Sequence, residues 1–232
     1  MTELHVLSAG AAKGVVLALA AALESATGAT LRGEFGAVGA MKEKMLAGAP
    51  CDVVILTAAM LEALARDGLV VADSIRSLGR VRTGVAVRAG EPAPPIADRA
   101  QLRSSLLAAR RLYLPDTERS TAGAHCLKVL RVLGIHDAVC SRVRSFESGA
   151  VAMSELARST GPWQLGCTQI TEINYTPGVA LVGPLPPEFE LATVYSAAVA
   201  VAAQHPELAL RSVELYTGSE SLSLREAGGF ER

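Results

Sequence analysis

The stretch GEFGAVGAMKEKMLAGAPCDVVIL, residues 33–56, joins a strand end, a turn, a helix and a second strand in direct succession. Gly36 and Gly39 frame the turn, where glycine adopts backbone angles that other residues avoid. Residues 40–47 fit a helix that a glycine stops. The run CDVVIL, residues 51–56, is largely apolar and typical of a strand buried on both faces. The stretch therefore predicts parallel strands connected by a helix.

The same alternation continues on both sides of this stretch. Residues 4–7 fit a short strand that runs into the small-residue turn SAGAAKG and then into a helix at 14–27. A strand follows at 30–35, and a helix at 60–67 comes after the central stretch. Strands that alternate with helices in this order predict an α/β fold, a parallel sheet with helices on both faces.

The rhythm changes after residue 80. Residues 81–90 alternate apolar and polar side chains, which indicates one long strand, and a long apolar strand is expected at 192–200. Between them lies a second set of elements, so we predict two doubly wound lobes. Lobe 1 combines residues 1–82 with 193–232, and lobe 2 is the inserted segment 83–192. The elements expected in lobe 2 include helices at 100–108, 125–133 and 150–157 and strands at 111–114 and 163–170.

Composition excludes several classes of function. Half of the 232 residues are hydrophobic and the net charge is −1, without the basic stripe of a nucleic-acid surface. The apolar run at 15–23 is too short to span a bilayer, so we expect no membrane-embedded segment. A strand from residue 4 leaves no room for a signal peptide. We therefore expect a cytoplasmic protein as the chain stands, or a periplasmic one if a signal has been removed.

The cysteines show no metal-binding or redox spacing, and we interpret all four as buried thiols (Cys51, Cys126, Cys140 and Cys167). No other motif indicates a metal or a cofactor, and we expect neither.

The loops at the carboxyl ends of the strands are the candidate ligand site, because open parallel sheets bind ligands there. Several of these loops open helices, whose free N–H groups bind anions. Thr57 fits a helix cap as well as a ligand contact, and Ser120 and Thr121 can serve both purposes. The candidate ligand-binding residues are Ser8, Ala9, Gly10, Ala11, Lys13, Gly36, Ala37, Val38, Thr57, Ser120, Thr121, Ala122, Gly123 and Gln169.

Three stretches resemble the type II periplasmic binding proteins, specifically the molybdate-binding branch that serves ABC transporters. They are VLSAGAAKGVVLALAAALESATG, GEFGAVGAMKEKMLAGAPCDVVILTAAMLEALARDGLV and the C-terminal AGGFER. The resemblance covers nearly the whole chain. It implies two lobes joined by two crossover strands, with a ligand cleft between them.

The departures from that branch bear on the ligand. Its hydroxyl residues in the first two loops are replaced by Gly10-Ala11-Ala12 and Ala37-Val38, and CTQITEI stands where its tyrosine is expected. A tetrahedral oxyanion would lose much of its polar shell. A small carboxylate with a carbon skeleton fits such a pocket better, and Gln169 could donate to it.

Two functions remain open. The first is a solute-binding protein for a small organic anion, with an ABC transporter permease as partner if it is exported. The alternative is a cytoplasmic isomerase of an unsaturated tricarboxylate, because some relatives of this branch resemble aconitate isomerase. That reaction removes and returns a proton, for which Lys13, His125 or Glu172 could be the base. A regulator's sensing domain shares the fold, but no DNA-binding helices precede residue 4.

Overall fold

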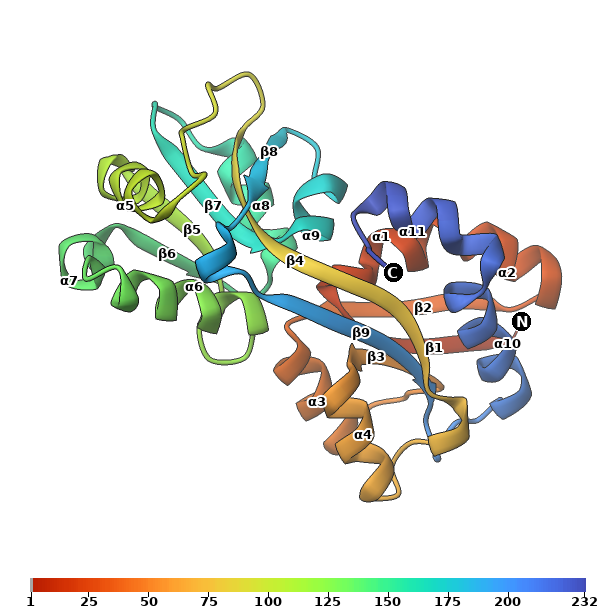
Figure 1. The fold of residues 1–232 in the computed structure, drawn as a ribbon. Coiled ribbons are helices and arrows are strands. Elements are labelled where there is room, and N and C mark those ends of the chain that lie inside the picture. The colour runs from red at the N-terminus through yellow and green to blue at the C-terminus, as the bar shows by residue number, and fades with distance from the viewer. Residues whose placement is uncertain (1) are drawn as a thin grey trace. The chain divides into compact units, whose positions relative to one another are not determined.

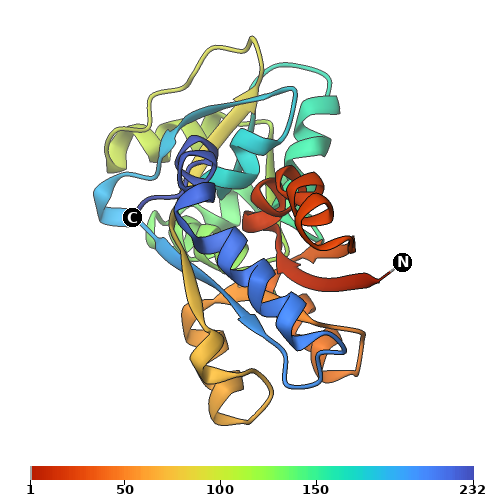
Figure 2. The same cartoon turned by 90° about the vertical axis from the view of Figure 1, so that its right-hand side faces the viewer.

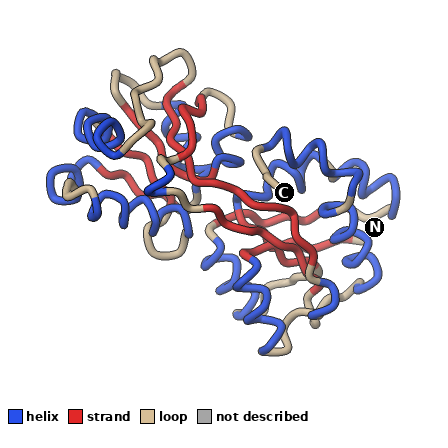
Figure 3. The backbone as a smooth tube through the Cα atoms, viewed as in Figure 1, coloured by secondary structure: helices blue, strands red, loops and turns tan. Residues whose placement is uncertain are grey.

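The chain folds as two units, and the computed structural model describes residues 2–232 (Figure 1). Unit 1 comprises the residues up to Val81 together with Thr193–Arg232, and unit 2 is Arg82–Ala192. Each unit has its own strands with helices packed outside them (Figure 3).

The sheet of unit 1 is mixed. Strand β1 (Glu3–Ala9) runs parallel to β2 (Thr30–Gly36) on one side and to β3 (Val53–Thr57) on the other. Strand β9 (Ala192–Val199) pairs with β3 in the opposite direction. The prediction of parallel strands holds for β1, β2 and β3, whereas the returning strand β9 is antiparallel to β3.

The helices of unit 1 include one correction. The helix predicted at 14–27 is two helices, α1 (Lys13–Ala18) and α2 (Ala20–Thr27), which meet at Leu19 with a bend of 51°. The bend lets Val15 and Val16 of α1 and Leu23 of α2 all be buried, and no proline marks it. The others are α3 (Val38–Leu46), α4 (Ala58–Arg66), α10 (Pro206–Thr217) and α11 (Leu222–Gly228). Figure 2 shows the two C-terminal helices beside the N-terminal pair, in agreement with contacts of α10 with α2 and of α11 with α1.

Within residues 2–232, no single helix has the length and the apolar composition to cross a membrane; the bent pair 10–18 and 20–27 passes that test only when its two parts are taken together.

The sheet of unit 2 has the order β4-β7-β5-β6, with β8 also paired to β4. Strand β5 (Arg111–Pro115) runs parallel to β6 (Val143–Phe146) and to β7 (Gln164–Gln169). The long strand β4 (Arg76–Arg88) runs antiparallel to β7 and to β8 (Val179–Pro184). The helices are α5 (Arg99–Ala108), α6 (Thr121–Val132), α7 (His136–Val139), α8 (Gly149–Arg158) and α9 (Ile170–Tyr175). Short 3-10 turns lie at Gly10–Ala12, Ala72–Ser74, Cys140–Arg142, Pro187–Phe189 and Ser219–Ser221.

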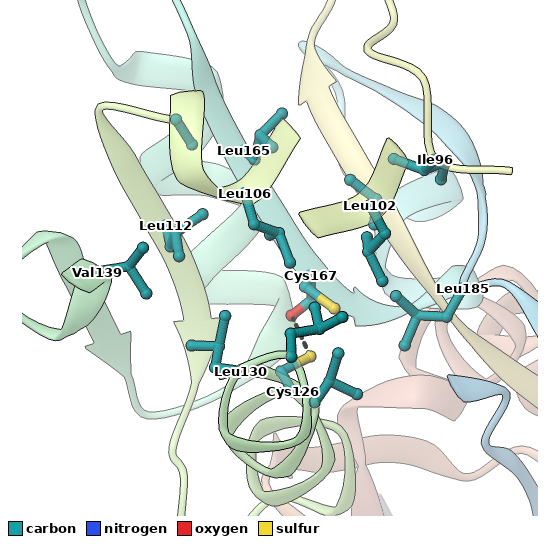
Figure 4. Close-up of a cluster of buried hydrophobic side chains, with 14 of the residues drawn as sticks. Ile96, Leu102, Leu106, Leu112, Cys126, Leu130, Val139, Leu165, Cys167 and Leu185 are labelled. Atoms are coloured by element: carbon teal, nitrogen blue, oxygen red, sulfur yellow. Dashed lines mark hydrogen bonds between the residues drawn. The ribbon is translucent and has the colours of Figure 1, made fainter. Parts of the chain in front are cut away.

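The two faces of this sheet carry different helices, and β7 shows the alternation. Leu165 and Cys167 point into the core beneath α5 and α6, where the Sγ of Cys126 lies 3.7 Å from the carbonyl oxygen of Cys167 (Figure 4). Gly166 faces the other way, because a Cβ built there would lie 2.4 Å from the Cε of Met153 on α8. Successive strand residues point to opposite faces. We call these the α6 face and the α8 face.

The cysteine prediction is partly wrong. Cys126 and Cys167 are buried, and burial raises the pKa of the half-buried Cys51 to about 12. Cys140 is exposed, because it lies in the 3-10 turn after α7 rather than in a core element.

Candidate anion-binding site

The first loop of unit 1 presents backbone and methyl groups rather than hydroxyls. Ser8, at the end of β1, is fully buried, and its hydroxyl donates to the carbonyl oxygen of Ala9 at 2.9 Å. Gly10 and Ala11 are buried in the 3-10 turn that follows, whose N-cap Ala9 makes no side-chain cap. The hydroxyl predicted to bind a ligand is therefore engaged with the backbone.

Lys13 opens α1 and is half-buried. Its Nζ lies 5.9 Å from the centroid of the Phe35 ring, within the range of a cation–π contact. The ammonium is therefore held toward β2, at the end of the strand that leads into the second loop.

The second and third loops of unit 1 differ in how they begin their helices. Ala37 caps α3 in an extended conformation without a side-chain acceptor, and Ala37 and Val38 are buried. Gly36 approaches α3 closely, because a Cβ there would lie 2.8 Å from the Cε of Met41. Thr57, by contrast, accepts the N–H of Met60 at 3.3 Å and caps α4. The hydroxyl of Thr57 thus has the capping role that the sequence left open.

In unit 2, helix α6 starts unusually close to the end of β5. A Cβ on Gly123 would lie 2.2 Å from the carbonyl oxygen of Asp116, so only glycine permits this approach. Ser120 is the N-cap and accepts the N–H of Gly123 at 3.3 Å. The Asp116 carboxylate accepts the N–H groups of Glu118 and Arg119, which lowers its pKa.

The first turn of α6 keeps donors of its own. A helix leaves its first N–H groups without partners inside the helix, and Thr121 and Ala122 stand at these positions. No acidic residue lies in this turn. It therefore combines backbone donors with the positive end of the helix dipole.

His125, one turn further along α6, has a structural contact. Its Nε2 lies 2.7 Å from the carbonyl oxygen of Phe189. A carbonyl only accepts, so Nε2 carries the hydrogen, and Nδ1 is the nitrogen that a neutral ring leaves free to accept.

Glu172 lies on the α8 face, and its carboxyl group occupies the start of a helix of its own chain. Its carboxylate is buried at the N-terminus of α8, where the N–H groups of Gly149, Ala150 and Gln169 donate to it. The hydroxyl of Thr168 donates to its Oε2 at 2.5 Å. Burial raises the pKa of Glu172, and these hydrogen bonds act in the opposite direction. The N-terminus of α8 thus already holds a carboxylate from its own chain.

The segment 168–172 joins the end of the predicted strand directly to a helix. Thr168 and Gln169 end β7, and Glu172 lies in α9, which the sequence analysis missed. Thr168 contacts Glu172 on the α8 face, so the alternation of β7 directs Gln169 to the α6 face. The two predicted site residues Gln169 and Glu172 therefore lie on opposite sides of the sheet.

Gln169 is 2% exposed, and neither its Nε2 nor its Oε1 has a hydrogen-bond partner among the described residues. Its register partner on β4 is Thr83, which is 1% exposed and whose Oγ1 is also unpartnered there. Residues directly opposite in a sheet point to the same face. Val85 and Cys167 pair two residues further along and lie in the α6-side core, which agrees with this orientation.

Gln169 lies level with the first turn of α6. Cys126 of α6 contacts Cys167 of β7. Strand β5 is parallel to β7, and α6 is the helix that returns after β5, so α6 runs in the direction opposite to β7. Five residues back along the helix from Cys126 to Thr121 span about 7.5 Å. Two residues forward along the strand from Cys167 to Gln169 span about 6.6 Å in the same direction. These lengths place Gln169, and Thr83 opposite it, level with the first turn of α6 along the sheet. We call this set the α6-face site.

Thr83 was missed by the sequence analysis. The available signal was a lone hydroxyl residue at an inward position of the alternating run VRTGVAV. Among residues 2–232, no group of three or more His, Cys, Asp and Glu side chains could hold a metal ion.

The sequence profile of the bacterial extracellular solute-binding proteins matches residues 4–231. The chain belongs to this family. The predicted type II periplasmic-binding-protein fold and the resemblance to its molybdate-binding branch are confirmed by this match and by solved structures. The periplasmic molybdate-binding protein of Azotobacter vinelandii is similar with a TM-score of 0.79 and 19% identity over 99% of each chain.

Two further relatives are informative. A chain of PEB3 from Campylobacter jejuni with bound L-phospholactate gives a TM-score of 0.71 at 13% identity, over 99% of each chain. An aconitate isomerase from Pseudomonas sp. is 28% identical over 239 residues, which cover 100% of this chain and 88% of that protein. The solute-binding relatives are described as extracellular or periplasmic, and they give the expected cytoplasmic location no support.

Proposed function

We propose that this solute-binding protein binds a small organic anion through a carboxylate group. The observation that carries the proposal is the α6-face site, in which unpartnered polar side chains lie level with a helix N-terminus. The N-terminus of α8, on the opposite face of the sheet, already holds the buried carboxyl group of Glu172. An incoming anion therefore has its best partner on the α6 face.

The loops of unit 1 favour a carbon skeleton over a bare oxyanion. Ala37 and Val38 supply backbone N–H groups flanked by methyl groups, and the hydroxyls of Ser8 and Thr57 are engaged with the backbone. If the protein is exported, its partner is an ABC transporter permease, because similar solved proteins are substrate-binding components of ABC transporters.

A thermal-shift screen tests this function. A ligand at 100 times its Kd adds about 2.7 kcal/mol to the free energy of unfolding. For a chain of this size that corresponds to roughly 5–11 °C in Tm. We expect shifts of this size with small di- or tricarboxylates and smaller shifts with molybdate and sulfate. Stabilisation by molybdate or sulfate alone would refute the carboxylate assignment.

A second candidate function is isomerisation of an unsaturated tricarboxylate, favoured by the full-length similarity to an aconitate isomerase. The contacts rank the three predicted bases. Glu172 would have to leave the N-terminus of α8, and Lys13 is held at the Phe35 ring. His125 keeps Nδ1 available while Nε2 bonds to Phe189. The reaction would therefore use His125 as its base.

Proton NMR in D2O, with cis- or trans-aconitate in excess, separates catalysis from binding. A new isomer or deuterium uptake that disappears in His125→Gln would establish the isomerase. Unchanged spectra for a ligand that raises the Tm would leave binding as the function.

A further inference from the structure

The unpartnered atoms of the α6-face site include acceptors as well as donors. The Nε2 of Gln169 has two hydrogens to donate, its Oε1 only accepts, and the Thr83 hydroxyl can do both. Buried polar atoms of this kind are nearly always paired in folded proteins. A pair that is buried, unpartnered and adjacent across two strands therefore indicates which groups its ligand must carry.

The first turn of α6 beside this pair contributes backbone donors. A carboxylate, sulfate or molybdate group only accepts, so it can pair with these N–H groups and with Nε2 of Gln169. It leaves the Oε1 of Gln169 without a donor. Leaving a buried acceptor unpaired is costly, so Oε1 needs a hydrogen from the Thr83 hydroxyl or from the ligand; a donor on the ligand leaves the Thr83 hydroxyl free to donate to the ligand as well.

We propose that Gln169 and Thr83 select anions that carry a hydroxyl group next to the carboxylate, that is, 2-hydroxy acids. This inference rests on the proposed function. The ligand carboxylate accepts from the first turn of α6 and from Nε2 of Gln169. The ligand hydroxyl donates to Oε1 of Gln169 and accepts from Thr83.

The charge of the site favours a hydroxyl over an ammonium group as the donor. The first turn of α6 is the positive end of a 12-residue helix and has no acidic residue. The buried carboxylate of Glu172 lies on the opposite face of the sheet. A 2-amino acid would place its cation against a positive helix end, whereas a hydroxyl donates without charge.

Isothermal titration calorimetry with matched acid pairs tests the inference. The pairs are malate and succinate, lactate and propionate, and citrate and tricarballylate, each differing by one hydroxyl. We expect the hydroxy acid of the pair that fits to bind about 10-fold more tightly, the size of effect typical of satisfying one buried polar group. This ratio should fall to about 1 in Gln169→Met, decrease in Thr83→Val and recover in Thr83→Ser.

Thr30→Val is the matched control. Thr30 also has a buried, unpartnered hydroxyl oxygen, but it starts β2 in unit 1, away from the carboxyl ends of the strands. It should leave the ratio unchanged. Equal binding of both members of every pair would overturn the inference and leave the proposed function intact, whereas no binding of any carboxylate would overturn both. If Gln169→Met does not fold, the two Thr83 variants still decide, because a ratio unaffected by Thr83→Val would contradict the proposed contact.

Discussion

Gly149→Ala should destabilise the protein severely for a change of one methyl group. A Cβ at this position would lie 1.9 Å from Oε2 of Glu172 and 2.1 Å from Oγ1 of Thr168. Real Cβ atoms do not approach other heavy atoms so closely, so the buried carboxylate must move away from the N-terminus of α8. The carboxylate would then lose hydrogen bonds that hold a charged, buried group.

The size of the effect follows from those contacts. A hydrogen bond to a charged group contributes about 1.5–3 kcal/mol, and Glu172 accepts several from backbone and Thr168. If one to two such hydrogen bonds are lost, the free energy of unfolding falls by about 3 kcal/mol. In a chain of this length that lowers the Tm by roughly 6–12 °C.

Differential scanning calorimetry measures the effect, with Gly228→Ala as the matched control. Gly228 is also helical, and a Cβ there would meet nothing within 4 Å. Replacing it should be neutral or stabilising by up to about 1 kcal/mol, because alanine favours helix more than glycine does. If the two variants melted at the same temperature, Glu172 would not cap α8 as described.

Three further substitutions probe individual contacts. Burial raises the pKa of Glu172, so the native state binds that proton more tightly than the unfolded chain does. In urea unfolding from pH 4 to 8, the wild type should therefore lose stability relative to Glu172→Gln as the pH rises. A relative gain in stability with rising pH would contradict the raised pKa. His125→Ala should lower the free energy of unfolding by about 1 kcal/mol, because the hydrogen bond to the carbonyl oxygen of Phe189 is lost. His125→Gln keeps a donor and should recover part of this free energy. An equal loss in both variants would exclude that hydrogen bond. Thr57→Ala should lower the free energy of unfolding by about 1 kcal/mol, because the N-cap of α4 is lost. Thr57→Ser keeps the capping hydroxyl, so urea titrations that show equal stability for the two variants would argue against capping.

The fold was predictable because local signals and tertiary structure agree. The run VVIL in β3 is fully buried, and the glycines after the early helices end them as expected. Gly28, for example, adopts the left-handed conformation at the C-cap of α2. The bend at Leu19 was not predictable, because burial of side chains on both sides of it decides it rather than a helix-breaking residue.

The site was predicted less completely because its roles depend on partners distant in sequence. Ser8, Thr57 and Ser120 were recognised as loop hydroxyls, but only the structure shows where each hydroxyl bonds. Glu172 looked like an open acid after a strand, and its burial against Gly149 could not be read from the sequence. Thr83 entered the site only through the register of β4 against β7.

The central claim is that this member of a solute-binding family takes a carboxylate rather than a bare oxyanion. Calorimetric titration of one protein preparation with malate and with molybdate, at equal pH and ionic strength, tests it most directly. We expect malate to bind at least about 10-fold more tightly than molybdate, which corresponds to about 1.4 kcal/mol. Tighter binding of molybdate would contradict it and would mean that the donors of this protein suffice to hold a tetrahedral oxyanion.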